Sequence, residues 1–212
     1  MSFEIWIRTH SSRLDCAFKL KEKCQVAFNG VSIHILNTGD KAKTYSEKFV
    51  ILLHRQLQMT HSPYILILED DMLIAHDIND RWSDVLHGSH CWLSIPSQTA
   101  LDNSIKCSET RYRLEVFQNF SYSGAVLLSR SLLKNFITHY LLSHQEGDAP
   151  NFDVNLSAYI KSCIGHLVLC PGIFGSDITL PSSIEDTIAQ LDFRSPVRIS
   201  ELDPLFDRHN SL

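Results

Sequence analysis

The sequence predicts an α/β fold in which helices cover both faces of a mostly parallel central sheet, a Rossmann-type three-layer sandwich. Apolar runs alternate with amphipathic segments over roughly the first 180 residues. The run at 64–68 is apolar throughout, as in a strand that is buried on both faces. Enough residues for a helix separate the first three apolar runs from one another. This spacing favours parallel strands, because neighbouring parallel strands are joined by a crossover connection that usually contains a helix.

The amino-terminal part of the chain predicts the order β-α-β-α-β. Its first strand ends in a polar cluster, and Asn29-Gly30 marks the turn before the second strand. The second helix carries apolar side chains at helical spacing, which favours packing against a sheet. We expect strands at about 3–8, 31–36 and 64–68, and helices at about 13–28 and 45–61.

The remaining chain is less regular. The segment 97–116 is polar and has no clear periodicity, so we expect a loop that covers the site. Prolines and isolated apolar residues predict that 181–212 is a tail packed on a single domain, 1–180. Ser129 is a candidate cap for the helix that follows it. We expect helices at 77–86, 130–143 and from about 151, and strands at 91–96, 126–128 and 166–170.

Composition and charge are those of an ordinary globular protein. The 212 residues suffice for one sizeable core, and 44% of them are hydrophobic. The net charge of −5 provides no general attraction to nucleic acid or to an anionic membrane. The six cysteines form no C-x-x-C pair of the kind found in zinc sites. Without a signal-peptide pattern or a membrane-spanning apolar stretch, we expect a cytoplasmic protein with no membrane span.

Three consecutive carboxylates, Glu69, Asp70 and Asp71, follow the 64–68 strand. Burying acids at the end of a core strand is costly unless a cation or hydrogen-bond donors compensate them. In an extended chain Glu69 and Asp71 point to one side and Asp70 to the other, so two acids can share a ligand. Mg2+ and Mn2+ bind through one or two carboxylates together with substrate phosphates. The pattern indicates a metal and nucleotide-diphosphate site, although acids that simply reach solvent would show it too.

Other polar residues are expected near these acids. The carboxyl ends of parallel strands lie at one edge of a sheet, so the loops that hold Arg8, Thr9 and Asp40 should meet the acids there. The first loop could bind a phosphate or a nucleobase, or could be a helix cap followed by a surface arginine. Asp153, at the start of a predicted helix, is either a helix cap or a general base.

The order of these segments resembles that of a nucleotide-sugar glycosyltransferase of the GT-A fold, over about residues 3–177. Glu69-Asp70-Asp71 after an apolar strand is similar to the D-x-D element of that fold. The segment 122–125, Tyr-Ser-Gly-Ala, resembles its acceptor-side glycine segment, and Asp153 resembles its catalytic acid position. The resemblance therefore implies a GT-A-like domain.

The resemblance also implies an activity. It is metal-dependent, inverting transfer of a sugar from a nucleoside-diphosphate sugar, with a UDP-sugar as the implied donor, to an acceptor hydroxyl. Asp71 would bind Mn2+ or Mg2+, and Asp153 would take the proton of the acceptor hydroxyl. Many such enzymes supply a late histidine as a metal ligand, but the turn at 171–177 has none. Asp177 could substitute, His166 or His209 could reach the site, or water could complete the metal shell.

By the same resemblance, Arg8, Thr9 and Asp40 would hold the base and ribose of the donor. Glu69 or Asp70 would contact the ribose or a water bound to the metal. The acceptor could be a saccharide, a protein side chain or a modified nucleic-acid base, each of which presents a hydroxyl.

Two other functions stay open. A metal-dependent nucleotidyl or phosphoryl transferase would also use clustered acids, but the sequence contains neither a Walker pattern nor G-x-G-x-x-G. A catalytically inactive nucleotide-sugar binding module would keep the fold and could retain the same acids.

Overall fold

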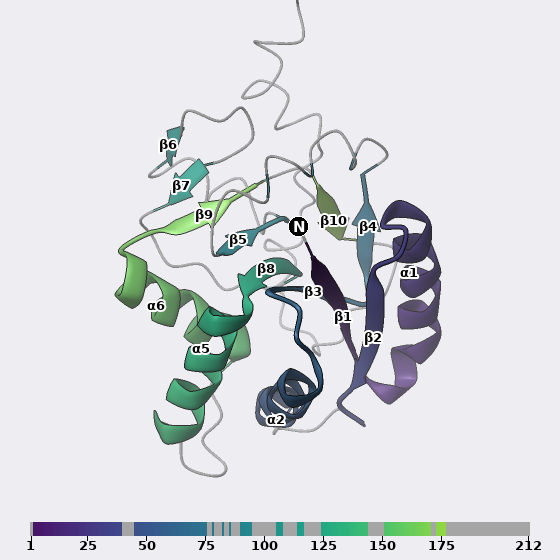
Figure 1. Ribbon diagram of the computed structural model, residues 1–212, viewed down its shortest axis with the longest axis horizontal. Coiled ribbons are helices and arrows are strands. Elements are labelled where there is room, and N and C mark those ends of the chain that lie inside the picture. Colours follow the sequence, from purple (N-terminus) through teal and green to yellow (C-terminus); the bar gives the residue numbers. More distant parts are fainter. Residues whose placement is uncertain are drawn as a thin grey trace, which may run out of the picture.

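The computed structural model describes residues 2–39, 45–75, 90–94, 105–107, 114–116, 124–143, 151–170 and 173–176, together with Ile78, Trp82 and Val85. These residues form an α/β sandwich of three layers (Figure 1). The central layer is a sheet, and each of its faces is covered by helices. The fold class that the sequence predicts is therefore confirmed.

The main sheet of the described chain has eight strands, in the order β2-β1-β3-β8-β5-β9-β7-β6. Strand β1 pairs in parallel with both β2 and β3, whereas β8 and β7 run antiparallel to their neighbours. All the other strands run in one direction, which makes the sheet mostly parallel, as expected. The bounds are β1 Phe3–Thr9, β2 Ser32–Asn37, β3 Tyr64–Glu69, β5 His90–Trp92, β6 Ile105–Cys107, β7 Leu114–Val116, β8 Ala125–Ser129 and β9 Leu167–Leu169.

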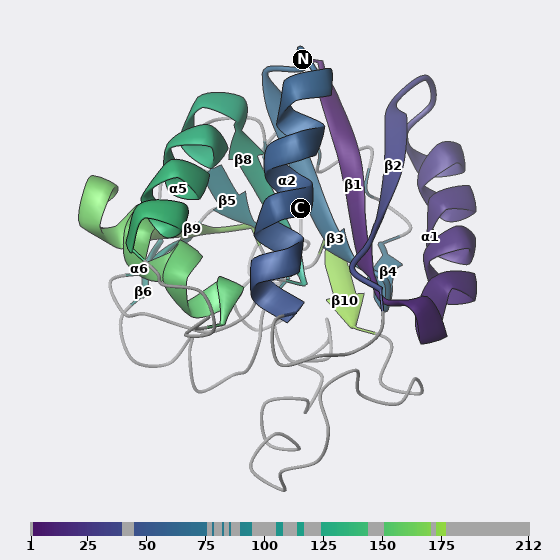
Figure 2. The same cartoon turned by 90° about the horizontal axis from the view of Figure 1, so that it is seen from below.

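Helix α1 covers one face of the sheet, and α2, α5 and α6 cover the other (Figures 1 and 2). Side chains alternate between the two faces along each strand, so Trp6 packs with α2 and α5 while Ile5 and Ile7 pack toward α1. A short 3-10 helix, η1, precedes α1. The bounds are η1 Ser11–Arg13, α1 Leu14–Ala27, α2 Tyr45–Met59, α5 Arg130–Ser143 and α6 Phe152–Ile164.

Strand β3 is the centre of both cores. The side chains from Ile65 to Leu68 are fully buried, because β1 and β8 flank the strand and helices cover both of its faces. This explains why the 64–68 run is apolar at every position. The strand carries the acids directly from the core to the edge of the sheet, since it ends at Glu69.

The structure differs from the sequence-based expectation in two places. The segment 97–116, expected as a loop, contains β6 and β7, which pair antiparallel at the edge of the sheet. A second sheet, formed by β4 (Met72–Ile74) and β10 (Phe174–Ser176), was not foreseen. Strands of three residues are too short to show a period of two clearly. Of the expected helix 77–86, Ile78, Trp82 and Val85 are helical and the rest lies outside the described residues, as does the tail 181–212.

None of the described helices is long and apolar enough to cross a membrane.

Candidate active site

The loops after β1, β2 and β3 meet at the carboxyl edge of the sheet, because these three strands are parallel. The backbone N–H of Thr38 donates to the carbonyl oxygen of Thr9 at 3.0 Å, and that of Ser11 donates to Gly39 at 3.0 Å. Gly39 adopts a positive φ of 80°, a backbone conformation that glycine reaches without strain. The loops after β1 and β2 are therefore bonded to each other at this edge, while Asp40 itself lies outside the described residues.

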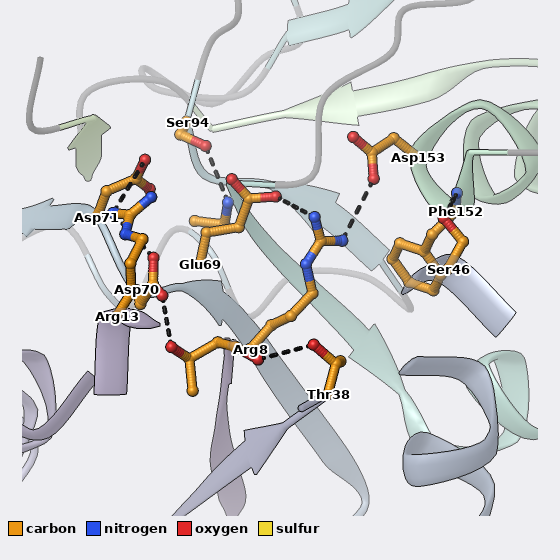
Figure 3. Close-up of polar contacts among 12 residues, drawn as sticks. Arg8, Arg13, Thr38, Ser46, Glu69, Asp70, Asp71, Ser94, Phe152 and Asp153 are labelled. Carbon is orange, nitrogen blue, oxygen red and sulfur yellow. Dashed lines mark hydrogen bonds and ion pairs between the residues drawn. The ribbon is translucent and has the colours of Figure 1, made fainter. Parts of the chain in front are cut away.

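The acidic turn, defined here as Glu69, Asp70 and Asp71, is divided between the two faces of the sheet (Figure 3). Glu69 ends β3 on the face of α2 and α6, where its Oε1 lies 2.7 Å from Arg8 Nη2. Asp70 lies on the side of α1, where Thr9 Oγ1 donates to its Oδ2 at 2.6 Å. The opposite directions of Glu69 and Asp70 agree with the alternation expected of a strand.

Asp71 does not follow that alternation. Strand β3 ends at Glu69, and residues 70–71 form the turn into β4. Arg13 Nη2 lies 2.9 Å from Asp70 Oδ1 and 3.7 Å from Asp71 Oδ2, so the two aspartates share one guanidinium. The expectation that Asp71 points to the same side as Glu69 is therefore wrong. Side chains alternate in direction only along extended backbone, and the strand ends before Asp71.

Asp153 lies in the first turn of α6 but does not cap it. The N-cap residue is Asn151, whose side chain makes no capping hydrogen bond. The N–H of Phe152 instead donates to Ser46 Oγ at 3.2 Å, across to the start of α2. Asp153 Oδ1 lies 3.6 Å from Arg8 Nη1. The N-cap interpretation of Asp153 is thereby excluded, and its carboxylate faces Arg8.

Arg8 joins the acidic turn to Asp153. Its guanidinium lies between Glu69 and Asp153 (Figure 3), and its side chain is only 9% exposed. The guanidinium carbon lies 5.1 Å from the ring centroid of Phe49 and 5.9 Å from that of Phe152. Planar guanidinium groups suit both ion pairing and contact with aromatic rings. This link was not predicted, because no local pattern in the sequence relates residue 8 to residue 153.

The negative charges are crowded around Glu69. The pKa of Glu69 is raised to about 7. Burial is the largest cause, Arg8 opposes it, and the neighbouring carboxylates of Asp71, Asp153 and Asp70 add to the increase. A carboxylic acid with a pKa this high is at the boundary of ionisation at neutral pH. The site would therefore bind an additional cation favourably.

Asp70 and Asp71 could provide part of a ligand set for such a cation. Burial raises the pKa of Asp70, although a hydrogen bond from Thr9 and the charge of Arg13 oppose the shift. Among the described residues, no group of three His, Cys, Asp or Glu side chains is arranged to hold a metal ion. The donor chemistry thus fits Mg2+ or Mn2+ only where phosphate oxygens complete the coordination. Asp177, the other expected ligand, lies outside the described residues.

Residues from other strands reach the same edge. The N–H of Glu69 donates to the carbonyl oxygen of Gly124 at 2.8 Å, so Gly124 is adjacent to the acidic turn. Ser94 is buried beside them, and its Oγ accepts from the N–H of Ala125 at 3.0 Å (Figure 3). The sequence held no signal for Ser94. Residues 122 and 123 of the glycine segment lie outside the described residues.

Comparisons with known proteins identify the fold. No family model matches the sequence, and no curated protein sequence is similar to it. A glycosyltransferase involved in the glycosylation of the major capsid of PBCV-1 matches in structure, with a TM-score of 0.50 at 8% identity over 81% of this chain and 82% of that one. The expectation of a GT-A-like fold is confirmed by this match.

Two further solved structures are similar at lower scores. A197 from STIV matches with a TM-score of 0.48 at 15% identity, over 84% of this chain and 86% of that one. Glucosyl-3-phosphoglycerate synthase from Mycobacterium tuberculosis, solved with Mn2+, UDP and glucosyl-3-phosphoglycerate, matches with a TM-score of 0.48 at 12% identity, over 97% of this chain and 80% of that one.

Proposed function

We propose that this chain is a glycosyltransferase that moves a sugar from a nucleoside-diphosphate sugar to an acceptor hydroxyl. One observation carries the proposal. The acidic turn, the loop after β1 and the start of α6 meet at one edge of a GT-A-like sheet, although they are far apart in the sequence. Ligands of open α/β sheets bind outside the carboxyl ends of the strands, which is where these segments lie. We take residues 1–180 as the catalytic domain.

The donor, with a UDP-sugar as the first candidate, binds with its diphosphate at the acidic turn. Asp71, with Asp177 as a second ligand, holds Mn2+ or Mg2+ there. When bound, this ion supplies positive charge that stabilises the diphosphate as a leaving group. Arg13 keeps Asp70 and Asp71 together, at 2.9 and 3.7 Å, so both carboxylates can face one ligand.

The base and ribose bind along the loops after β1 and β2. Thr9 supports this part of the site by holding its loops in place. Its hydroxyl donates to Asp70 in the acidic turn, and its carbonyl oxygen accepts from the N–H of Thr38 in the loop after β2. Asp40 is the other candidate for contact with this part of the donor, whereas the guanidinium of Arg8 is directed to Glu69 and Asp153. Glu69 or Asp70 contacts the ribose.

Asp153 acts as the general base. The acceptor oxygen forms a bond to the anomeric carbon, and the bond from that carbon to the diphosphate breaks, with its electron pair leaving on the diphosphate. The acceptor proton passes to the carboxylate of Asp153. Attack opposite the leaving group inverts the anomeric configuration. The carboxylate of Asp153 lies in the first turn of α6, and its Oδ1 is 3.6 Å from Arg8 Nη1.

Thermal unfolding tests the donor site. Purified protein is melted with a panel of nucleoside diphosphates and nucleotide sugars, each with Mn2+, Mg2+ or a chelator. A ligand at a hundredfold excess over its Kd should stabilise the protein by about 2.7 kcal/mol. We expect this stabilisation with one nucleotide and a metal ion, and its loss with chelator or in Asp71→Ala. Glu22→Gln, which changes an exposed acid in α1, should keep it. Absence of stabilisation by every nucleotide with every metal would contradict the proposal.

A second candidate function is a nucleotide-sugar binding module without turnover. The observation that favours it is that Arg8 and Arg13 already lie against all three carboxylates of the acidic turn, which reduces the need for a metal ion. This candidate predicts a nucleotide-dependent shift that survives the chelator, and no release of nucleoside diphosphate from any nucleotide sugar.

A further inference from the structure

We infer that Arg8 is a positioning residue: it is anchored on Glu69 of the acidic turn and aims Asp153, the proposed base. The guanidinium of Arg8 then links Glu69, on the proposed donor side of the site, to Asp153, on the proposed acceptor side. The inference rests on the proposed function and goes beyond it, because the resemblance assigned Arg8 only to the base and ribose of the donor.

The position of Arg8 is set by the centre of the fold. It lies in β1, where its backbone is in register with Leu36 of β2 and Glu69 of β3. Its side chain is 9% exposed and lies over the rings of Phe49 and Phe152. A side chain confined by two neighbouring strands and two rings has little freedom to move, so it can serve as a fixed reference for groups that approach it.

The contacts of Arg8 with its two carboxylates are unequal. The 2.7 Å pair with Glu69 has the length of a strong charge-assisted hydrogen bond, about 2.7–2.9 Å. The 3.6 Å separation from Asp153 is longer than such a bond. Arg8 therefore holds Glu69 tightly and attracts Asp153 without a close hydrogen bond, which leaves the Asp153 carboxylate able to accept the proton of an acceptor.

The start of α6 depends on contacts from other elements. Its N-cap, Asn151, provides no side-chain hydrogen bond. The described contacts that hold this turn include the bond from Phe152 N–H to Ser46 Oγ, the packing of the Phe152 ring against Phe49 and Phe136, and the contacts of Phe152 and Asp153 with Arg8. The backbone of the turn is therefore held without Arg8. Arg8 acts on the Asp153 carboxylate itself, so its loss should displace that carboxylate specifically.

The test separates kcat from KM in four variants: Arg8→Gln, Arg8→Lys, Asp153→Asn and the double variant Arg8→Gln/Asp153→Asn. A misplaced catalytic group can lower turnover about 100-fold, so we expect a loss of that order in kcat for Arg8→Gln, with little change in the donor KM. Arg8→Lys should recover part of kcat, because lysine keeps the charge but not the planar fork. The double variant should be no slower than Asp153→Asn, because Arg8 acts through Asp153.

A matched control is available at the opposite end of the sheet. Arg130, at the start of α5, is also a partly buried arginine, and its Nη2 donates to the carbonyl oxygen of Leu57 at 3.0 Å. Arg130→Gln should leave kcat and the donor KM unchanged. An equal loss of kcat in this variant would overturn the inference, since any partly buried arginine would then have the same effect.

Two other results would overturn it. Arg8→Gln could raise the donor KM without changing kcat, which would make Arg8 a donor-binding residue, or the losses of the single variants could multiply in the double variant. If the unmodified protein shows no transfer, the proposed function fails, and a double-mutant cycle on urea unfolding decides the inference. Coupling of roughly threefold or more in the unfolding constant supports positioning of Asp153 by Arg8, and additivity overturns it.

Discussion

The carboxylates at the two ends of the central sheet have different partners, and their pKa values are shifted in opposite directions. At the amino end of β1, Glu4 accepts hydrogen bonds from the hydroxyls of Thr60 and Ser62 and from Trp6 Nε1, and His34 Nε2 lies 3.4 Å away. Burial raises the pKa of Glu4, but the bonds from Thr60, Trp6 and Ser62 and the nearby His34 outweigh it, so its pKa is below the usual value. Neutral donors satisfy this single acid, and it stabilises the fold.

At the carboxyl end of β3, the acidic turn crowds three acids into one place. Burial and mutual repulsion raise the pKa of Glu69 to about 7, although Arg8 pairs with it. Burial also raises the pKa of Asp70. Groups with perturbed pKa values that gather at a sheet edge are typical of functional sites. The difference indicates that Glu4 serves stability, whereas the acidic turn is arranged for a ligand at some cost in stability.

Replacement of Asp153, the proposed base, should lower kcat far more than replacement of Glu4 at the other end of the sheet. Asp153→Asn removes the proton acceptor, and general bases contribute typically 10²- to 10⁴-fold, so we expect kcat to fall by about that factor. Steady-state release of nucleoside diphosphate measures it. Glu4→Gln, at the other end, should change kcat less than twofold per unit of folded protein, a limit on the order of ordinary assay scatter. Comparable losses in both variants would remove the functional distinction between the ends.

Replacement of Glu4, in contrast, should lower the free energy of unfolding. Glu4→Gln keeps the shape of the side chain but loses charge-assisted hydrogen bonds, each worth about 1.5–3 kcal/mol. We expect the free energy of unfolding to fall by about 2 kcal/mol, measured by urea denaturation at neutral pH. The exposed control Glu22→Gln should stay within about 0.5 kcal/mol of the parent protein. An unchanged midpoint for Glu4→Gln would show that the Glu4 hydrogen bonds do not stabilise the fold.

The contributions of Glu4 and Glu69 to the free energy of unfolding should depend on pH with opposite sign. The folded pKa of Glu4 is below its ordinary value of 4.5, so its stabilisation is complete above about pH 4.5 and is lost as pH falls through the folded pKa. The folded pKa of Glu69, about 7, lies above its ordinary value of 4.5, so ionisation of Glu69 destabilises the fold as pH rises from 4.5 to 7.

Urea unfolding across this range, in chelator, measures both effects by comparison with the glutamine variants. The stability lost in Glu4→Gln should shrink below pH 4.5. The stability of Glu69→Gln relative to the parent should increase between pH 4.5 and 7. Parallel curves for the two variants would contradict the opposite roles of the two acids.

Local patterns were sufficient to predict much of the fold. Helix α5 spans Arg130–Ser143, as its apolar periodicity predicts, and Ser129 Oγ accepts from the N–H of Leu132 as the expected cap. The apolar run of β3 correctly indicated a central strand, because burial on both faces leaves no place for polar side chains. Strand parallelism then placed the loops and the acids at one edge.

Features that depend on exact backbone direction or long-range packing could not be predicted. The direction of Asp71 requires knowledge that β3 stops at Glu69. The link from Arg8 to Asp153 requires the position of the first turn of α6 relative to the end of β1, which no local pattern contains. Strands β6 and β7 were missed, because each has only three residues within a polar segment. Asp40 and Asp177 stay predictions, since neither lies among the described residues.

The central claim is that the acidic turn is the donor site of a glycosyltransferase, and calorimetric titration of UDP tests it most directly. The account predicts saturable binding of UDP in Mn2+ or Mg2+, at least tenfold weaker in chelator or in Asp71→Asn, a change of about 1.4 kcal/mol. Glu4→Gln, at the structural end, should bind as tightly as the parent. UDP binding with the same affinity in Asp71→Asn as in the parent protein would contradict the claim.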